Sequence, residues 1–406
     1  MVQNDPRARR YPSMSIRIGI CGVGAFAGRF IPLFKHHPEV ENVVLCDLDA
    51  QKLDDKCAQF DISDRCPSLD DLCATNVDAI AIITQHHLHG PQAVQALRAG
   101  KHVYSAVPAA LSVEEMSALV CAVEETGKTY MVGETSYYYP CAIYCRQQYR
   151  NGAFGDIVYA EGEYYHDYNH GLIDVLQRRH GPQWRRYANW PPFFYPTHSV
   201  SMVVSVTGAY ATQVSAMGVT DRDPDGLFHQ VDQIYDNHFS NESMLCRMSD
   251  GSVARFNEFR RIGHPGTERL SMHGTKASYE EQTGSQVWVT RNPEETRDLT
   301  AELICRDLAV DADSEMATIS GGGTHKGVSS VHPIGNLPKE FIGLPNGHSG
   351  SHHFLAHDFV AACVTGTTPP NNVWVAARYL VPGLIAHESA LKGGVLMDVP
   401  DFGDPR

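Results

Sequence analysis

The hydrophobic positions in the first third of the chain form short apolar runs separated by segments with helical spacing. The runs at 16–20, 42–47 and 78–84 have the length and composition of buried parallel strands. Asp49 and Ser112 stand where helix N-caps are expected, and Ser112 opens a capping box. This regular alternation of strand and helix predicts an α/β Rossmann domain, which is a doubly wound parallel sheet.

From about residue 137 the pattern changes to longer strands in which apolar and polar residues alternate. The segments 157–165 and 252–256 show this period of two. Such alternation is typical of an antiparallel sheet that has one face on a core and the other face open. Helices are expected at 353–364 and 374–391. The second region is therefore predicted to be an α+β domain with a mostly antiparallel open sheet.

These patterns divide the chain into a polar tail (1–14), a Rossmann domain (15–136) and an α+β domain (137–406). The tail has three arginines with no apolar run after them, so we expect a disordered or tag-like segment and no secretory signal. Residues 170–197 are predicted to be loop-like. Residues 310–350, rich in Gly, Ser and His, are predicted to be an irregular insertion.

Composition narrows the range of partners and of cellular location. The formal net charge of −14 argues against binding to nucleic acid or to an anionic membrane surface. The 11 cysteines are scattered and include no Cys-x-x-Cys motif, which favours reduced thiols and a cytoplasmic location. An open sheet face in the second domain favours a homo-oligomer, a dimer or a tetramer.

The first apolar run leads directly into a glycine-rich turn that has the features of a dinucleotide site. Gly22 permits a tight turn, Gly24 lets the backbone approach a pyrophosphate, and the small Ala27 lets the next helix lie close to the sheet. Asp47 ends the next strand, where an acid can bind ribose hydroxyls and repel a 2′-phosphate, so NAD is favoured over NADP. An ordinary surface turn is the alternative interpretation. The turn residues assigned to the cofactor are Gly22, Gly24, Ala25, Phe26 and Ala27.

Residues that follow the other strands are further candidates, because ligands of open α/β sheets bind at the carboxyl ends of the strands. Three such turns follow the strands predicted to end near residues 84, 104 and 132. The residues that we assign there to the cofactor site are Thr84, His86, His89, Ala106, Pro108 and Glu134.

Several motifs together resemble the Gfo/Idh/MocA oxidoreductase family. They are the glycine-rich start, the Thr-x-x-x-x-His turn at 84–89, Ala-Gly-Lys-His-Val at 99–103 and the proline-containing turn after it. The resemblance covers nearly the whole chain and implies an NAD-dependent enzyme. Most members carry Glu-Lys-Pro where this chain has Ala106-Val107-Pro108, and their lysine assists proton transfer from the substrate hydroxyl. Either this chain is a non-catalytic NAD-binding sensor, or other residues perform the proton chemistry.

The segment Phe-Phe-Tyr-Pro-Thr-His at 193–198 supplies candidates for that chemistry. His198 titrates near neutral pH and can accept a hydroxyl proton, and Tyr195 can hydrogen-bond the same hydroxyl. A packing role at a helix start is the alternative for His198. Together with Val-Pro-Ala-Ala at 107–110 and Gly-His-Ser-Gly at 347–350, this segment resembles the family's NAD-dependent glycosidases, typified by the α-N-acetylgalactosaminidases. That branch usually has Glu where this chain has Ala106.

The glycosidase resemblance implies hydrolysis of a pyranoside with hydride transfer at C3, elimination of the aglycone, addition of water and return of the hydride. It implies that His198 and Tyr195 act on the C3 hydroxyl and the C2 proton. It further places Glu134 near nicotinamide and substrate, and lets Tyr165 or His166 assist the leaving group or water. The alternatives are a net NAD-dependent sugar or polyol dehydrogenase and a non-catalytic NAD-binding sensor.

Other polar groups have both a functional and a structural interpretation. Trp184, Arg185 and Arg186 offer stacking surfaces and fork-shaped donors for a sugar, or they form an aromatic-packed surface loop. His353 and His357 share a helical face, but no third ligand stands at a known spacing, so we expect no metal site. The acidic residues at 161 and 163 share one strand face, which is either a hydrolytic pair or a solvated surface.

Overall fold

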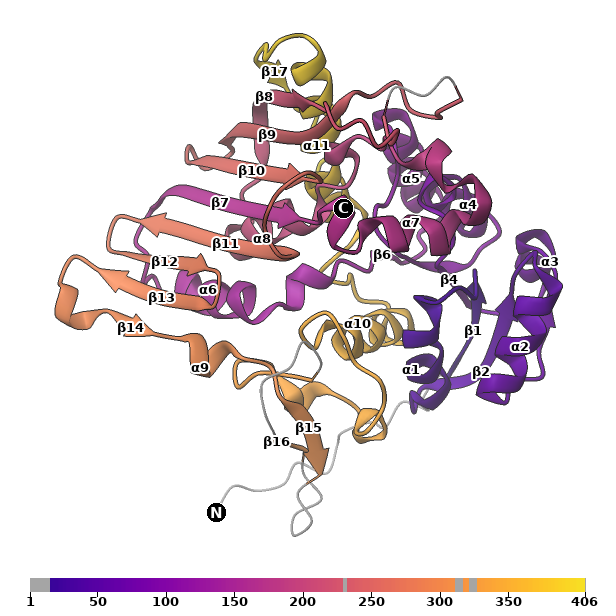
Figure 1. The fold of residues 1–406 in the computed structure, drawn as a ribbon. Coiled ribbons are helices and arrows are strands. Elements are labelled where there is room, and N and C mark those ends of the chain that lie inside the picture. Colours follow the sequence, from indigo (N-terminus) through magenta and orange to yellow (C-terminus); the bar gives the residue numbers. More distant parts are fainter. Residues whose placement is uncertain (1–14, 229–231, 311–316, 321–326, 406) are drawn as a thin grey trace, which may run out of the picture.

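The computed structural model describes residues 15–228, 232–310, 317–320 and 327–405. Its first sheet has six parallel strands in the order β3-β2-β1-β4-β5-β6, as predicted for a doubly wound domain (Figure 1). The strands are β1 (Ile16–Cys21), β2 (Val40–Cys46), β3 (Arg65–Cys66), β4 (Ala79–Ile82), β5 (His102–Ser105) and β6 (Tyr130–Val132). The helices that accompany them are α1 (Ile31–His36), α2 (Ala50–Phe60), α3 (Leu69–Ala74), α4 (His89–Arg98) and α5 (Val113–Thr126).

The predicted caps set the starts of two of these helices. The Asp49 side chain accepts a hydrogen bond from the Lys52 amide, and the Ser112 hydroxyl accepts one from the Glu115 amide. The Glu115 carboxylate bonds the amide of Leu111, one residue before the cap. Satisfied first-turn amides explain why both helices begin where the sequence predicts.

The second sheet has nine strands in the order β14-β13-β12-β11-β7-β10-β9-β8-β17. Neighbouring strands are antiparallel except for β7 and β10, which confirms a mostly antiparallel sheet. The strands are β7 (Ile157–Tyr165), β8 (Ala211–Thr220), β9 (Phe239–Met248), β10 (Val253–Phe259), β11 (Thr267–Gly274), β12 (Ala277–Gln282), β13 (Ser285–Thr290), β14 (Arg297–Asp298) and β17 (Met397–Asp398). A separate hairpin joins β15 (Asp307–Val310) to β16 (Ala317–Ser320).

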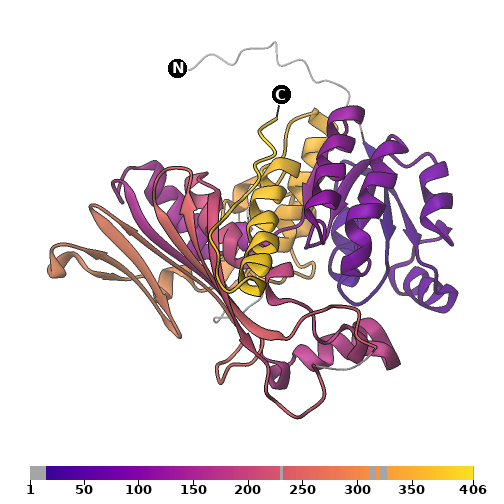
Figure 2. The same ribbon diagram turned by 90° about the horizontal axis from the view of Figure 1, so that it is seen from above.

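One face of this sheet is covered by helices and the other is open (Figure 2). The covering helices are α6 (Pro140–Arg150), α8 (Thr197–Thr207) and α11 (Val373–Leu391). Ala160, Phe256 and Met272 point toward them and are buried. Met217 and Leu245 remain exposed. This asymmetry is the structural basis of the period-two pattern along these strands.

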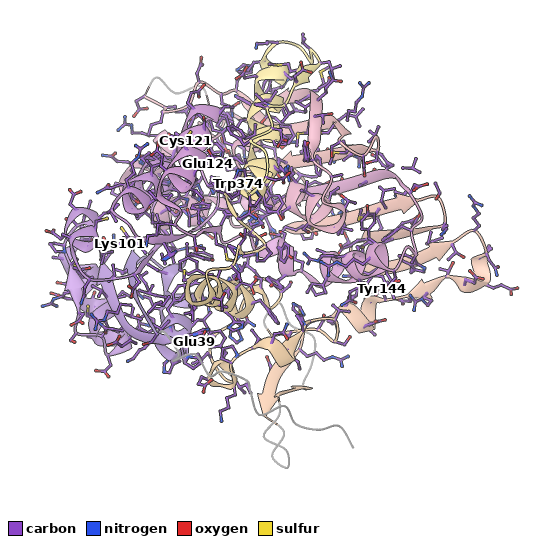
Figure 3. The ribbon with its side chains drawn as sticks, turned by 180° about the vertical axis from the view of Figure 1, so that it is seen from behind. Glu39, Lys101, Cys121, Glu124, Tyr144 and Trp374 are labelled. Carbon is purple, nitrogen blue, oxygen red and sulfur yellow. The ribbon has the colours of Figure 1, made fainter. Side chains whose placement is uncertain are left out.

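The C-terminal helices also pack against the first sheet. Phe359 of α10 (Ser351–Thr365) lies with its ring centroid 6.3 Å from that of Phe34 and 5.7 Å from that of Tyr104. Helix α11 packs on α5, and Figure 3 shows Trp374 beside Cys121 and Glu124. The last part of the chain therefore helps to build the core around the nucleotide-binding sheet.

The segment 170–197 differs from its loop-like prediction. It contains helix α7 (Leu172–His180), whose Leu176 is buried in a small separate core with Tyr168 and Phe228. The loop-like prediction is therefore wrong for 172–180: Leu172, Ile173 and Leu176 recur at helical spacing, and the Arg, Trp, Tyr and Pro residues that follow them concealed this short pattern. The segment 310–350 contains β16 and two short 3₁₀ turns, and 1–14, 311–316 and 321–326 lie outside the described residues. No helix in the described ranges is long and apolar enough to cross a membrane.

Candidate functional site

The glycine-rich turn has the geometry that a dinucleotide needs. Gly22 has φ +89°, and a Cβ there would lie 2.5 Å from the Ile83 carbonyl oxygen, so only glycine fits against the end of β4. Around Gly24 no heavy atom lies within 4 Å of the position of a Cβ, which leaves room for a pyrophosphate. Ala25 is exposed in the same turn and Ala27 is buried beneath it. These residues fit NAD.

Asp47 holds the shape of this turn. One carboxylate oxygen accepts a hydrogen bond from the Val23 amide at 2.9 Å, and the other accepts one from the Asp49 amide at 3.0 Å. A carboxylate oxygen has two acceptor sites, so Asp47 retains capacity for ribose hydroxyls. Its predicted place beside the cofactor turn is therefore compatible with NAD.

The Gly-His-Ser-Gly segment packs against the same turn. The Phe26 ring centroid lies 5.8 Å from that of His348 and 5.7 Å from that of His352, and the two imidazoles are hydrogen-bonded at 2.9 Å. His348 and Ser349 have φ +46° and +51°. Left-handed non-glycine residues are uncommon and cluster at functional sites. Two segments separated by more than 300 residues of sequence thus meet at the predicted cofactor turn.

His89 joins the turns that follow β4 and β5. Its two ring nitrogens lie 2.9 Å from the Pro108 carbonyl oxygen and 3.1 Å from the Thr84 carbonyl oxygen, and burial lowers its pKa to about 4. The Thr84 methyl group lies against Gly22, and Ala106 is buried directly after β5. The structure therefore gathers these candidates along one edge of the sheet.

His86 of the same loop faces the second domain. Its ring centroid lies 4.7 Å from that of Trp190 and 5.3 Å from that of Tyr195. Its Nε2 accepts a hydrogen bond from Arg179 of α7 at 2.8 Å. This residue connects the cofactor loop to the predicted substrate loop.

Glu134 and His198 form the centre of the site. The Glu134 Oε1 lies 2.7 Å from His198 Nδ1, and both side chains are buried. Glu134 follows β6 and also accepts the Ser136 amide, while His198 is the second residue of α8. Burial acts to lower the pKa of His198, but the charge and hydrogen bond of Glu134 outweigh it and raise the pKa to about 9. Burial acts to raise the pKa of Glu134, but the charge and the hydrogen bond of His198 outweigh burial and lower this pKa.

Two glycines allow His198 to reach this position. A Cβ on Gly162 of β7 would lie 2.1 Å from the Ser199 carbonyl oxygen, so the first turn of α8 rests directly on the strand. A Cβ on Gly383 of α11 would lie 2.5 Å from the Phe193 carbonyl oxygen and from Pro196. Close backbone approach at both glycines seats the loop that carries Tyr195 and His198.

Aromatic side chains surround the imidazole of His198. The ring centroids of Tyr164 and Tyr195 lie 5.2 Å and 5.1 Å from it. The Tyr164 hydroxyl lies 2.8 Å from Nδ1 of His166, and burial, followed by the Arg260 charge, lowers the pKa of His166 to about 4. The structure therefore brings the candidates Tyr195 and His166 to the Glu134–His198 pair.

Tyr165 is not brought to this cluster. Adjacent residues of a strand point to opposite faces, and Tyr165 lies on the open face, stacked on Phe259 with ring centroids 5.1 Å apart. Its neighbour Tyr164 faces His198 instead. Sequence reasoning did not single out Tyr164, although Gly162 shares its face and marks the point where α8 approaches.

The residues Trp184, Arg185 and Arg186 also lie outside the cluster. Trp184 packs against the small core around Leu176, and Arg185 lies over its ring. Arg185 bonds the carbonyl oxygens of 225 and 226, and Arg186 bonds that of Asp232. They tie the short 3₁₀ segment 181–187 to a neighbouring loop, so their observed contacts are structural.

The remaining polar candidates have structural partners. Glu161 and Glu163 pair with Arg255, and Glu163 also bonds Arg269 on the open face. His357 is hydrogen-bonded to His37 at 3.0 Å. His353 lies 3.2 Å from a backbone carbonyl oxygen. No group of three metal-ligating side chains occurs within the described ranges.

Comparison with known proteins assigns the first domain. Residues 16–134 match the model of an oxidoreductase family described as having an NAD-binding Rossmann fold. A glycosyl hydrolase family 109 protein from Streptomyces niveus is 25% identical over 415 residues, spanning 96% of this chain and 77% of the relative. A second protein of that name, from Solibacter usitatus, is 25% identical and spans 96% of this chain and 89% of the relative.

Solved structures share this fold over nearly the whole chain. Levoglucosan dehydrogenase in complex with NADH and levoglucosan superposes with a TM-score of 0.70 at 18% identity, over 95% of this chain and 100% of the other. The myo-inositol 2-dehydrogenase from Lactobacillus plantarum gives a TM-score of 0.67 at 17% identity, with the same coverage. These similarities establish the fold.

Proposed function

Residues 16–134 carry the NAD-binding domain of the Gfo/Idh/MocA oxidoreductases, and from that premise we propose that this enzyme hydrolyses a pyranoside through transient oxidation at C3. The observation that carries the proposal is the buried Glu134–His198 pair, which lies among tyrosines beside the cofactor edge. The turn after β5 has Val107 in place of a lysine, so the imidazole is the candidate for proton transfer. Relatives named for glycoside hydrolysis support this choice.

The residues that would hold NAD line the carboxyl edge of the first sheet. Gly22 and Gly24 would leave room for the pyrophosphate, Asp47 would offer oxygens to the ribose, and Glu134, which follows β6, would lie near the nicotinamide. NAD supplies a hydride acceptor that can later return the hydride to the same carbon. Glu134 Oε2 is buried and lacks a hydrogen-bond partner of good geometry among the described residues, which suits a site completed by a ligand.

His198 exchanges the protons that accompany the change at C3 and C2. Its imidazole accepts the C3 hydroxyl proton, passes this proton to water, and is then free to accept the C2 proton, which becomes acidic beside the new carbonyl. Glu134 holds the ring through Nδ1, so Nε2 is the atom free to act on the sugar. Burial raises the pKa of Tyr195 to about 12, so this hydroxyl stays protonated and donates a hydrogen bond that orients the sugar.

A net sugar dehydrogenase is the second candidate function. The fold shared with levoglucosan dehydrogenase and with an inositol dehydrogenase favours it. Both functions begin with hydride removal from a ring carbon and need the same proton acceptor. They differ in whether the reduced cofactor accumulates.

The test is to incubate the purified protein with a panel of 4-nitrophenyl glycosides and free sugars, and to follow nitrophenolate and NADH absorbance together. The proposed cycle predicts nitrophenolate release without NADH accumulation. NADH that builds up in proportion to an oxidised sugar would instead establish the dehydrogenase. A protein that binds NAD and turns over nothing in the panel would contradict both.

A further inference from the structure

A row of three polar residues crosses the helix-covered face of the second sheet next to His198. Tyr164 of β7 pairs with Glu258 of β10 on one side and with Glu268 of β11 on the other. Directly paired residues project to the same face of a sheet. Tyr164 contacts the imidazole of His198, so both carboxylates flank the residue that borders the proposed site.

The two carboxylates of this row have different surroundings. Glu258 is fully buried, accepts the Ser199 hydroxyl at 2.5 Å and is bonded by Arg260 at 2.9 Å. Glu268 is partly exposed, and no arginine, lysine or histidine in the described part of the chain forms an ion pair with it. Glu258 therefore anchors the first turn of α8, whereas Glu268 has no such ion-pair partner among the described residues.

Other groups of the site lie around Glu268. The Tyr139 hydroxyl is buried and lacks a hydrogen-bond partner of good geometry among the described residues. Burial, and after it the charge of Glu268, raise the pKa of Tyr139. The same charge adds to the effect of Glu134 on the pKa of His198. Glu268 thus faces the same space as His198, from a different strand.

We propose that Glu268 is a catalytic residue that protonates the glycosidic oxygen during aglycone departure, an inference that rests on the proposed hydrolytic function. The Glu268 carboxylate first takes up from water the proton that His198 released after oxidation at C3. When the C1–O bond breaks, Glu268 gives this proton to the oxygen, which leaves as an alcohol. The C2 proton passes to His198, and its electron pair forms the C1–C2 double bond. Water then adds: its oxygen bonds C1, one of its protons goes to Glu268, and C2 takes a proton from His198, which exchanges its proton with solvent while the intermediate is bound. The Glu268 proton reaches the C3 oxygen when the hydride returns.

The geometry also explains why two separate groups are needed. His198 acts at C3 and C2, and the glycosidic oxygen lies on C1, beyond the carbon that His198 deprotonates. Glu268 lies on the other side of Tyr164 from Glu258. It can therefore serve as a second proton donor without disturbing the Glu134–His198 pair. A general acid in such a position typically contributes 10²- to 10⁴-fold.

The experiment compares leaving groups in single turnovers with Glu268→Gln. Enzyme loaded with NAD is held in excess over the 4-nitrophenyl glycoside that the wild type cleaves, and over the methyl glycoside of the same sugar. Nitrophenolate can leave as an anion without being protonated. The methoxy group must be protonated and leaves as methanol. We expect methanol release to slow by about 100-fold or more and nitrophenolate release by less than about threefold. Exchange of the C2 hydrogen with solvent should be unchanged.

The matched control is Glu280→Gln, on β12, because Glu280 is exposed on the sheet and takes no part in the proposed site. The melting temperature and fluorescence-detected NAD binding of both variants should equal those of the wild type. If Glu268→Gln is unstable, Glu268→Asp replaces it and should show an intermediate, still leaving-group-dependent loss. If Glu268→Gln slows the release of methanol and of nitrophenolate equally, or slows neither, the proposed role of Glu268 is overturned and the proposed hydrolytic function still stands. A wild type that cleaves no glycoside would overturn both.

Discussion

The Oε1 atom of Glu134 and the Nδ1 atom of His198 are 2.7 Å apart, and both residues are buried. Glu134 follows the last strand of the first sheet, and His198 opens a helix that covers the second sheet. A buried pair of this kind fixes the orientation of the imidazole and its affinity for a proton. Elements of the two sheets thus meet at a charged hydrogen bond placed beside the predicted cofactor edge.

The first prediction concerns pH. In the free enzyme His198 has a pKa of about 9, so at neutral pH it is mostly protonated and cannot accept a proton. We therefore expect kcat/KM to rise with pH, with an ascending limb near pH 9. Glu134→Gln removes the charge that raises this pKa, so the limb should move to lower pH. Profiles of both proteins test this, and an unmoved limb would show that another group controls the reaction.

The second prediction concerns the face of β7. Tyr164 borders His198, whereas Tyr165 stacks on Phe259 on the opposite face. Tyr164→Phe removes the hydroxyl that bonds His166 and should lower kcat by about 10-fold or more, as the loss of one positioned polar group does. Tyr165→Phe makes the same chemical change and should leave kcat within about twofold. Equal effects in steady-state assays would contradict this assignment of faces.

The third prediction concerns Gly162. A Cβ there would lie 2.1 Å from the backbone of Ser199, and backbone atoms cannot rotate aside as a side chain can. Gly162→Ala should therefore displace the start of α8, cost about 1–3 kcal/mol of unfolding free energy and lower kcat. Gly263→Ala is the control, because nothing lies within 4 Å of its Cβ position and its φ is not positive. Urea unfolding and activity assays compare the two, and equal stability would contradict the close approach.

The fourth prediction separates two roles in the cofactor turn. Gly22→Ala places a methyl group 2.5 Å from the Ile83 carbonyl oxygen at φ +89°, so the melting temperature should fall even without NAD. Gly24→Ala meets no atom of the protein and should leave that temperature unchanged, while NAD affinity falls about 10-fold or more. Thermal melts and fluorescence titrations measure both. Unimpaired NAD binding by Gly24→Ala would mean that the pyrophosphate lies elsewhere.

Local sequence patterns were sufficient to predict both sheets and the turn that would hold NAD. The apolar runs of the first third, the caps Asp49 and Ser112 and the alternation along 157–165 each reflect contacts within one element and its neighbours. These features depend on residues close together in the sequence, so the sequence alone is enough to predict them. The loop-like prediction for α7 was wrong, because this helix has only 9 residues and its apolar positions at 172–176 stand before a stretch rich in Arg, Trp, Tyr and Pro.

The composition of the site could be predicted only in part. The family motifs indicated Glu134, Tyr195 and His198, but their mutual contact depends on how α8 rests on Gly162. Which of two adjacent tyrosines faces the imidazole depends on the register of β7, which a sequence of neighbouring aromatic residues does not specify. Cross-strand relations such as Tyr164 with Glu268 likewise arise only when the sheet forms.

The most direct test of the account follows the C2 hydrogen of the sugar. Hydrolysis by oxidation and elimination breaks the C2–H bond in every turnover, whereas direct displacement at C1 leaves it intact. The cleaved glycoside is incubated with enzyme and NAD in D₂O, and the released sugar is examined by NMR. We predict one deuterium at C2 in the product of the wild type. A product that retains its hydrogen at C2 would contradict the proposed mechanism.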